Sequence, residues 1–303
     1  MARKYAKCSC CEGSFPVIDM VGTISAKRGG QPEYMCADCA TRNQGYHASN
    51  DKVMGTEKVN DVFCGIENET SFTDEYARNA MFEYGFIPTH DSSLHSDGMG
   101  TRYGWDRNTC EYVSSLMRGL NRASKFALTC DRLIAEGHLR INDSCGTHFH
   151  VSIDSMKDKD GNKTYMGYIR RFYNSLFVPL CEEMKANPEA TKALFGRFFT
   201  GYAQAIDMNT TQSYHGDRYY FINCMADNNI EFRLNRFVSG KQYQALMKME
   251  VEMVKCIVAN FCEHFMDTEW DRRRYEKRTA YRKHKAQVTA AKLVKIFRKY
   301  ANI

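Results

Sequence analysis

Apolar and polar residues alternate along several short stretches of this chain. Residues 62–72, 109–115 and 145–154 follow this period of two, which is typical of half-buried β-strands. Residues 219–225 and 229–237 are also predicted as strands, and the turn-forming sequence Ala-Asp-Asn separates them. Two strands joined by such a turn predict a β-hairpin.

Other stretches carry apolar residues at the spacing of helices. They are residues 74–86, 116–137, 164–185 and 241–266. Because the strands contain the polar residues and the helices supply aliphatic cover, the pattern predicts an α+β fold. In this fold helices cover one face of an antiparallel sheet, and the other face of the sheet is polar.

Three strands each carry two charged or metal-binding residues at positions i and i+2. The pairs are Glu67 and Glu69, His148 and His150, and Glu231 and Arg233. Residues i and i+2 of a strand point to the same face, so three such pairs on neighbouring strands would line one cavity. Such a cavity is suited to metal and phosphate.

The chemistry of each pair leaves alternatives open. Two adjacent carboxylates are costly to bury without a cation, and hard cations such as Mg²⁺ prefer oxygen ligands; a solvated acidic strand face is the alternative. Imidazole serves as a metal ligand or a phosphate donor, or is satisfied within the core. Arg233, with Arg236 nearby, suits phosphate oxygens or a cross-strand salt bridge.

The chain has 13 cysteines, and their spacing separates them into two kinds. Cys8-x2-Cys11 and Cys36-x2-Cys39 are 24 residues apart, which predicts a closed structural zinc site with four thiolates. Cys10 is the alternative to Cys8 as a ligand. The cysteines beyond residue 39 have no repeated spacing and are expected to be buried as small apolar residues.

Length and composition predict a globular protein with a small additional module. The chain has 303 residues, of which 43% are hydrophobic and 26% charged. No stretch approaches the roughly 18 apolar residues of a membrane helix, and the start lacks a secretory signal, so we expect a cytoplasmic protein without a membrane partner. The expected boundaries are a zinc module at 1–45, a linker at 46–59, a main domain at 60–266 and a basic tail at 267–303.

Positive charge is concentrated near the end of the sequence. Residues 271–303 hold twelve Lys or Arg against two acidic residues, a net charge of +10, so the +6 of the whole chain leaves −4 for residues 1–270. This segment predicts one basic helix with an apolar stripe formed by Val288, Leu293, Ile296 and Phe297. Either the stripe docks the helix, or its charge binds nucleic acid or another acidic partner.

Five short motifs, taken in order, resemble those of the amidoligase family of the glutamine synthetase and γ-glutamylcysteine ligase superfamily. They are GIENE at 65–69, DSSL at 91–94, EYVSS at 111–115, CGTHFHVSI at 145–153 and NIEFRLNRF at 229–237. The resemblance implies ATP-dependent carboxylate–amine ligation through an acyl phosphate, on a glutamine-synthetase-like antiparallel sheet. The implied substrate is a small molecule or peptide that offers a carboxylate and an amine.

The resemblance also implies roles for individual residues. The metal ligands would be Glu67, Glu69, Glu111 and Glu231, which bind Mg²⁺. The nucleotide contacts would be His148, His150, Arg233 and Arg236, and Arg233 would also act on the transferred phosphate beside Glu67, Glu69 and Glu111. Asp91 and Ser93 match an acidic loop of the family, where Ser92 replaces the usual glycine.

A second interpretation starts from the zinc cysteines and the basic tail. Together these features are typical of a nucleic-acid-binding protein. In that interpretation the chain is a metal-dependent nucleic-acid enzyme or binding protein, and His148 and His150 form its metal site.

Overall fold

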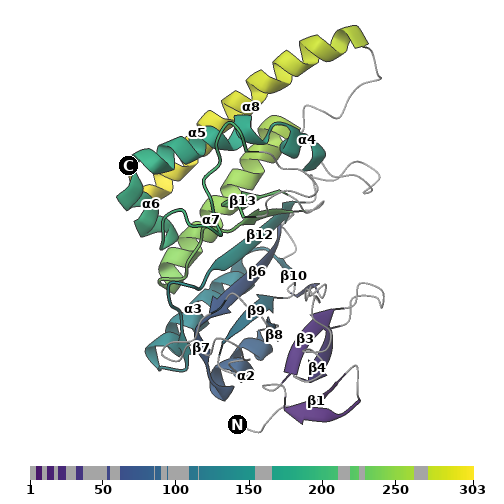
Figure 1. Ribbon diagram of the computed structural model, residues 1–303, viewed down its shortest axis with the longest axis vertical. Coiled ribbons are helices and arrows are strands. Elements are labelled where there is room, and N and C mark those ends of the chain that lie inside the picture. The colour runs from purple at the N-terminus through teal and green to yellow at the C-terminus, as the bar shows by residue number, and fades with distance from the viewer. Residues whose placement is uncertain are drawn as a thin grey trace. The chain divides into compact units, whose positions relative to one another are not determined.

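The computed structural model mixes helices and strands, which confirms the α+β class (Figure 1). The structure describes residues 5–8, 12–16, 20–24, 32–36, 53–54, 62–84, 86–89, 94, 109–114, 116–153, 166–210, 219–224, 229–262 and 272–303. Within these ranges, no helix is both long enough and apolar enough to cross a membrane.

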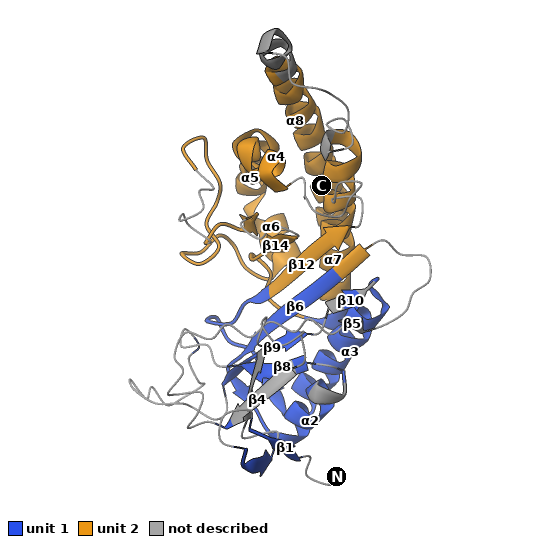
Figure 2. Cartoon of the chain, turned by 90° about the vertical axis from the view of Figure 1, so that its right-hand side faces the viewer, with its two compact units in different colours: residues 1–60, 64–147, 239–241 blue, residues 61–63, 148–238, 242–303 orange. Residues whose placement is uncertain are grey.

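The chain divides into two compact units (Figure 2). Unit 1 contains residues 1–60, 64–147 and 239–241, and unit 2 contains residues 61–63, 148–238 and 242–303. The division falls within strands β6 (Val62–Thr70) and β12 (Thr147–Ile153).

One eight-stranded sheet carries the polar pairs. Its strands follow the order β13-β14-β12-β6-β10-β5, and β9 pairs with both β6 and β8. The further strands are β5 (Val53–Met54), β8 (Phe86–Thr89), β9 (Cys110–Ser114), β10 (Leu116–Arg118), β13 (Ile222–Asn223) and β14 (Ile230–Phe232). Antiparallel pairing joins β6 to β9, β8 to β9, β12 to β14 and β13 to β14, whereas β5 and β10 run parallel.

The structure confirms the predicted hairpin and refines several boundaries. β13 and β14 pair antiparallel, with Asn223 opposite Glu231. The stretch predicted as a helix over 116–137 begins with strand β10, and α3 (Asn121–Ala135) follows it. Within the expected linker, residues 53–54 form β5, and the rest of 46–59 lies outside the described residues.

Strand β6 shows how one sequence pattern produces two different faces. Val62, Cys64 and Ile66 are buried, whereas the alternating positions Phe63, Gly65 and Glu67 are half-buried. Burial of the apolar side chains fixes the register, because a slip of one residue would move all of them to the polar face. Glu67 therefore has to lie on the side of the sheet opposite this apolar face.

In unit 1, α2 (Glu75–Glu83) contacts β8, and α3 contacts β11. The buried residues of α3 include Ala123, Phe126, Cys130 and Leu133, which recur at helical spacing. The ring of Phe126 stacks on that of Phe86 in β8, with a centroid distance of 4.1 Å. Smaller two-stranded sheets pair β1 (Tyr5–Lys7) with β2 (Ser14–Pro16), β3 (Met20–Ile24) with β4 (Pro32–Cys36), and β7 (Phe72–Thr73) with β11 (Leu139–Arg140).

Unit 2 is mostly helical. Its helices are α4 (Met166–Arg171), α5 (Tyr173–Ala186), α6 (Pro188–Phe195), α7 (Gly240–Ile257), the π-helical turn η4 (Val258–Cys262) and α8 (Arg272–Ala301). The helix predicted over 164–185 is thus two helices that meet at Phe172. The hydroxyl of Tyr173 in α5 donates a hydrogen bond to the carbonyl of Ile222, which joins this helix to β13.

The predicted basic helix is a single helix, α8, and an apolar stripe docks it beside α5 and α6 (Figure 1). Leu293, Ile296 and Phe297 are buried, as the sequence predicts. Val288 is 38% exposed, so its assignment to the stripe is wrong. The stripe instead continues through Ala286 and Ala290, whose small side chains allow close approach of the helices.

Six of the scattered cysteines are buried, in agreement with the sequence interpretation: Cys64, Cys110, Cys130, Cys145, Cys181 and Cys224. Cys256 is half-buried, and the burial of Cys262 lies outside what the structure describes. Burial raises the pKa of Cys181 to about 12 and also raises the pKa values of Cys130 and Cys224. These thiols are therefore neutral near pH 7 and poor nucleophiles. None of the cysteines within the described ranges forms a disulfide.

A carboxyl group lies inside the core of unit 2. Glu250 of α7 is fully buried, and the side-chain amide of Asn235 donates a hydrogen bond to its Oε2 at 3.2 Å. Burial raises the pKa of Glu250 well above its ordinary value because the charged form loses its hydration.

We expect Glu250 to make stability fall as pH rises. The unfolded chain releases this proton near pH 4.3, whereas the folded protein holds it to higher pH. Between these two pKa values, rising pH therefore favours the unfolded chain. Glu250→Gln cannot ionise, so in urea unfolding between about pH 5 and 8 the variant should lose less stability than the wild type. Parallel stability curves for the two proteins would contradict the assignment.

Candidate metal and phosphate site

Four neighbouring strands, β9, β6, β12 and β14, bring carboxylates and imidazoles to one face of the sheet. In the register of β6 and β9, Glu69 lies opposite Glu111, and Glu67 lies two residues away on the same face. In the register of β12 and β14, His150 lies opposite Glu231. The i, i+2 pattern of the sequence thus corresponds to real neighbours across the strands.

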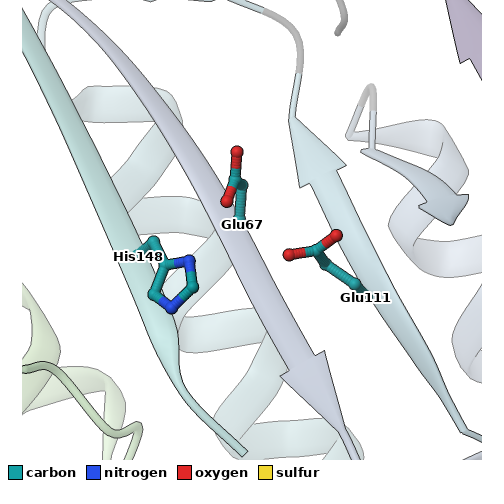
Figure 3. A group of neighbouring side chains, drawn as sticks. All are labelled: Glu67, Glu111 and His148. Carbon is teal, nitrogen blue, oxygen red and sulfur yellow. The ribbon is translucent and has the colours of Figure 1, made fainter. Parts of the chain in front are cut away.

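Glu67, Glu111 and His148 form the first group of donors. One ligand atom from each residue lies within 4.8 Å of the others, which is the spacing of side chains that share a metal ion. Figure 3 shows the three side chains on three adjacent strands. Glu67 and Glu111 are half-buried and His148 is buried, so part of the group remains open to solvent.

A second group contains Glu67, His150 and Glu231, also with ligand atoms within 4.8 Å of one another. Glu67 belongs to both groups. His148 links the two as well, because its Nδ1 lies 3.6 Å from Oε1 of Glu231. The residues could therefore hold two cations close together, with Glu67 as the shared ligand.

Glu231 is held from two sides. The side-chain amide of Asn223 donates to its Oε2 at 2.6 Å, and Nη1 of Arg233 pairs with its Oε1. Arg233 lies just after β14, and its side chain is 13% exposed. Its Nε is buried without a hydrogen-bond partner among the described residues. A buried guanidinium N–H in this state is suited to an anion such as phosphate.

The predicted ligand Glu69 has a different environment from Glu67. Its Oε2 accepts a hydrogen bond from the backbone N–H of Gly146, at the start of β12. Glu69 is 6% exposed and belongs to neither donor group in the described part of the chain. The structure therefore gives Glu69 a role in holding the strand that carries His148.

Several residues around the site were not found from the sequence. The hydroxyl of Thr89 donates to Oε2 of Glu111 at 3.0 Å, and Asn229 lies 3.3 Å from Nδ1 of His150. Arg197 donates to the carbonyls of Arg233 and Leu234 at 2.7 and 2.9 Å. Knowledge of the strand register would have revealed Asn223, which faces Glu231 across the predicted hairpin.

Cys8 and Cys36 meet near the N-terminus. Both are buried, and the backbone N–H of Cys36 donates to Sγ of Cys8 at 3.2 Å. The backbone N–H of Glu12 donates to the Cys8 carbonyl at 2.9 Å. Cys10, Cys11, Cys39, Asp91 and Ser93 lie outside the described residues.

Arg236, which the sequence predicts as a nucleotide contact, is held through its backbone. Its N–H donates to the Phe195 carbonyl at 2.8 Å.

Comparison with protein-family models and with curated protein sequences gave no match to this chain.

The shared position of Glu67 gives a test that separates it from Glu69. Mn²⁺ accepts the same carboxylate and imidazole ligands and can be followed by electron paramagnetic resonance. Glu67→Gln should weaken Mn²⁺ binding by about tenfold or more, because it removes a ligand from both groups. Glu69→Gln is the matched control, since it changes the same charge on the same strand and keeps an oxygen for Gly146. Equal losses in the two variants would contradict the shared-ligand assignment.

Proposed function

We propose that this chain is an ATP- and Mg²⁺-dependent ligase that joins a carboxylate to an amine through an acyl phosphate. The observation that carries the proposal is the pair of donor groups that share Glu67, with Arg233 beside Glu231. The ordered motifs described above support the same function. The proposed substrate is a small molecule or peptide that offers the carboxylate and the amine.

The donor set fits divalent cations. Each group contains two carboxylates and one imidazole, and hard cations such as Mg²⁺ prefer oxygen ligands. Glu67, Glu111 and His148 would hold one ion, and Glu67, His150 and Glu231 a second. When bound, such ions would neutralise phosphate charge and leave coordination positions for substrate oxygens.

Arg233 is the candidate for binding the transferred phosphate. Its Nη1 is held by Glu231, which fixes the plane of the guanidinium, while its Nε has no partner among the described residues. Arg197 would hold the backbone that carries this guanidinium, since it donates hydrogen bonds to the carbonyls of Arg233 and Leu234. A fixed guanidinium stabilises negative charge that develops during phosphoryl transfer without having to reorganise.

The proposed reaction has two steps. The substrate carboxylate attacks the γ-phosphorus of ATP, which forms an acyl phosphate and releases ADP. The amine nitrogen then attacks the acyl carbon, the C–O bond to phosphate breaks, and amide, inorganic phosphate and a proton are released. Neither step requires a protein nucleophile, and the raised pKa of the buried thiol of Cys224 agrees with a site that uses none.

The cysteine module would have a separate, structural role. Cys8 and Cys36 lie close together, as two ligands of one zinc ion must. An N–H donated to sulfur stabilises a thiolate, which favours Cys8 over Cys10 as a ligand. With Cys11 and Cys39 the set would be four thiolates, which leaves the ion no coordination position for substrate.

We expect the purified protein to release ADP and phosphate from Mg²⁺ and ATP only when acid and amine substrates are both supplied. A mass-spectrometric screen of acid and amine pairs identifies the product. Glu67→Gln should reduce turnover by about 100-fold or more, since it alters both cation sites. Glu182→Gln makes the same substitution at an exposed position on α5 and should keep full activity. A contaminating ATPase would leave equal activity in the Glu67→Gln preparation.

Two results would overturn the ligase proposal. One is nuclease activity that needs the metal but no nucleotide, which would favour the nucleic-acid enzyme. The other is the absence of ATP binding by calorimetry in a protein that still binds Mn²⁺.

The zinc proposal has an independent test. The protein should contain about one equivalent of zinc by atomic absorption. Cys8→Ser should lose this zinc, whereas Cys10→Ser and Glu67→Gln should retain it. Zinc that persists in Cys8→Ser but disappears when His148 is changed to Ala would assign the metal to the sheet instead.

A further inference from the structure

Helix α8 carries far more positive charge than its packing requires. It contains 30 residues, which corresponds to a length of about 45 Å. Residues 272–303 contain twelve Lys or Arg and a single acidic residue, Glu276. A helix that only docks against its own protein needs an apolar stripe and a few ion pairs, and this one has much more charge.

The described part of α8 falls into two segments with different surroundings. Buried side chains occur from Ala286 to Phe297, where the helix packs on its own unit. From Thr279 to Lys285 no side chain is buried, and Tyr281, Lys283 and His284 are exposed. The guanidinium of Arg282 lies over the ring of Tyr168 in α4, at 5.2 Å from its centroid. This first segment therefore exposes one side of the helix, which carries Tyr281, Lys283 and His284, to solvent.

Only part of the charge on α8 is neutralised within unit 2. Arg298 pairs with Glu183 of α5 at 2.8 Å, and Lys299 pairs with Glu252 of α7 at 2.8 Å. Lys283 and Lys295 are exposed and form no ion pair with a described residue. Lys292 is exposed and bonds the neutral side chain of Asn260.

We define the basic face of α8 as Lys283, His284, Lys292 and Lys295. These residues lie outside the apolar stripe and are all exposed. Between them on the helix lie Gln287, Val288 and Ala291, which are uncharged. The face therefore contains three lysines and one histidine without a carboxylate among them, and it is suited to an anionic partner.

We propose that the basic face of α8 binds the phosphate backbone of double-stranded DNA. A single projecting helix is convex, and the major groove of B-DNA, about 12 Å wide, admits a helix of this kind. The major groove of an RNA duplex is too narrow for one. Single-stranded nucleic acid is bound by exposed aromatic rings on which its bases stack. The described part of α8 has one such ring, Tyr281, and Nζ of Lys285 already lies over it at 5.5 Å from its centroid. This part of the chain therefore offers no platform for stacking single-stranded bases.

This inference is independent of the ligase proposal, because it concerns residues on α8 and none on the sheet. Binding through phosphates alone would be weak and without sequence preference, with dissociation constants in the micromolar range near physiological salt. Each phosphate contact also releases counterions, so affinity should fall steeply as salt increases.

The test uses the full chain and a fluorescent DNA duplex of about 20 base pairs, followed by anisotropy at several salt concentrations. Lys283→Glu/Lys295→Glu should weaken DNA binding by about tenfold or more. It should also make the negative slope of log K against log salt shallower by about two. Lys125→Glu/Lys192→Glu changes the net charge equally at exposed positions on α3 and α6, and should retain most of the affinity. Circular dichroism checks that both variants keep their helices.

Three outcomes would overturn the proposal. The first is an equal loss in the two double variants, which would assign binding to net charge. The second is equal or tighter binding of an RNA duplex or a single strand of the same sequence. The third is a dependence on Lys283 and Lys295 for anionic vesicles but not for DNA. Glu67→Gln should bind DNA as the wild type does, and Lys283→Glu/Lys295→Glu should keep its ATP-dependent activity, so failure of one proposal leaves the other testable.

Discussion

The crowding of like charges on one face of the sheet is the constraint on which this structure depends. Ligand atoms of Glu67 and Glu111 lie within 4.8 Å of each other, and two such charges repel by at least roughly 3 kcal/mol at an effective dielectric constant of 20. The same two carboxylates belong to a group with His148. A bound cation would attract both carboxylates and offset their repulsion. The cluster is therefore better explained as a binding site than as a source of stability.

The fold keeps these carboxylates in place through contacts with uncharged neighbours. Thr89 fixes Glu111, Asn223 fixes Glu231, and the backbone of Gly146 fixes Glu69. Each contact comes from a strand beside the one that it supports. Register between strands, set by burial of the apolar face, therefore also determines the geometry of the polar face.

The sequence was sufficient to predict the faces of the strands but not their neighbours. Alternation around Glu67, His148 and Glu231 follows from the local chain and is visible without a structure. Thr89 and Arg197 act through strand pairing and a long-range backbone contact, for which no local pattern exists. Glu69 and Glu67 look equivalent in sequence, and only the position of Gly146 across the sheet separates them.

The same limit explains the error at Val288. An apolar residue near a helical stripe is expected to be buried, but the direction of the stripe depends on which helices receive it. The neighbours α5 and α6 select the face with Ala286 and Ala290, and Val288 lies outside it. Helical periodicity therefore predicts that a face exists, whereas the partner elements decide its angular position.

The docking of α8 also has a consequence for the order of events during synthesis. The ion pair between Glu183 and Arg298 joins residues 115 positions apart in the chain. The apolar surface of α5 that α8 covers is consequently made well before its partner and stays exposed to water while the intervening residues are translated. Unit 2 is therefore prone to aggregation on the ribosome until α8 has been synthesised.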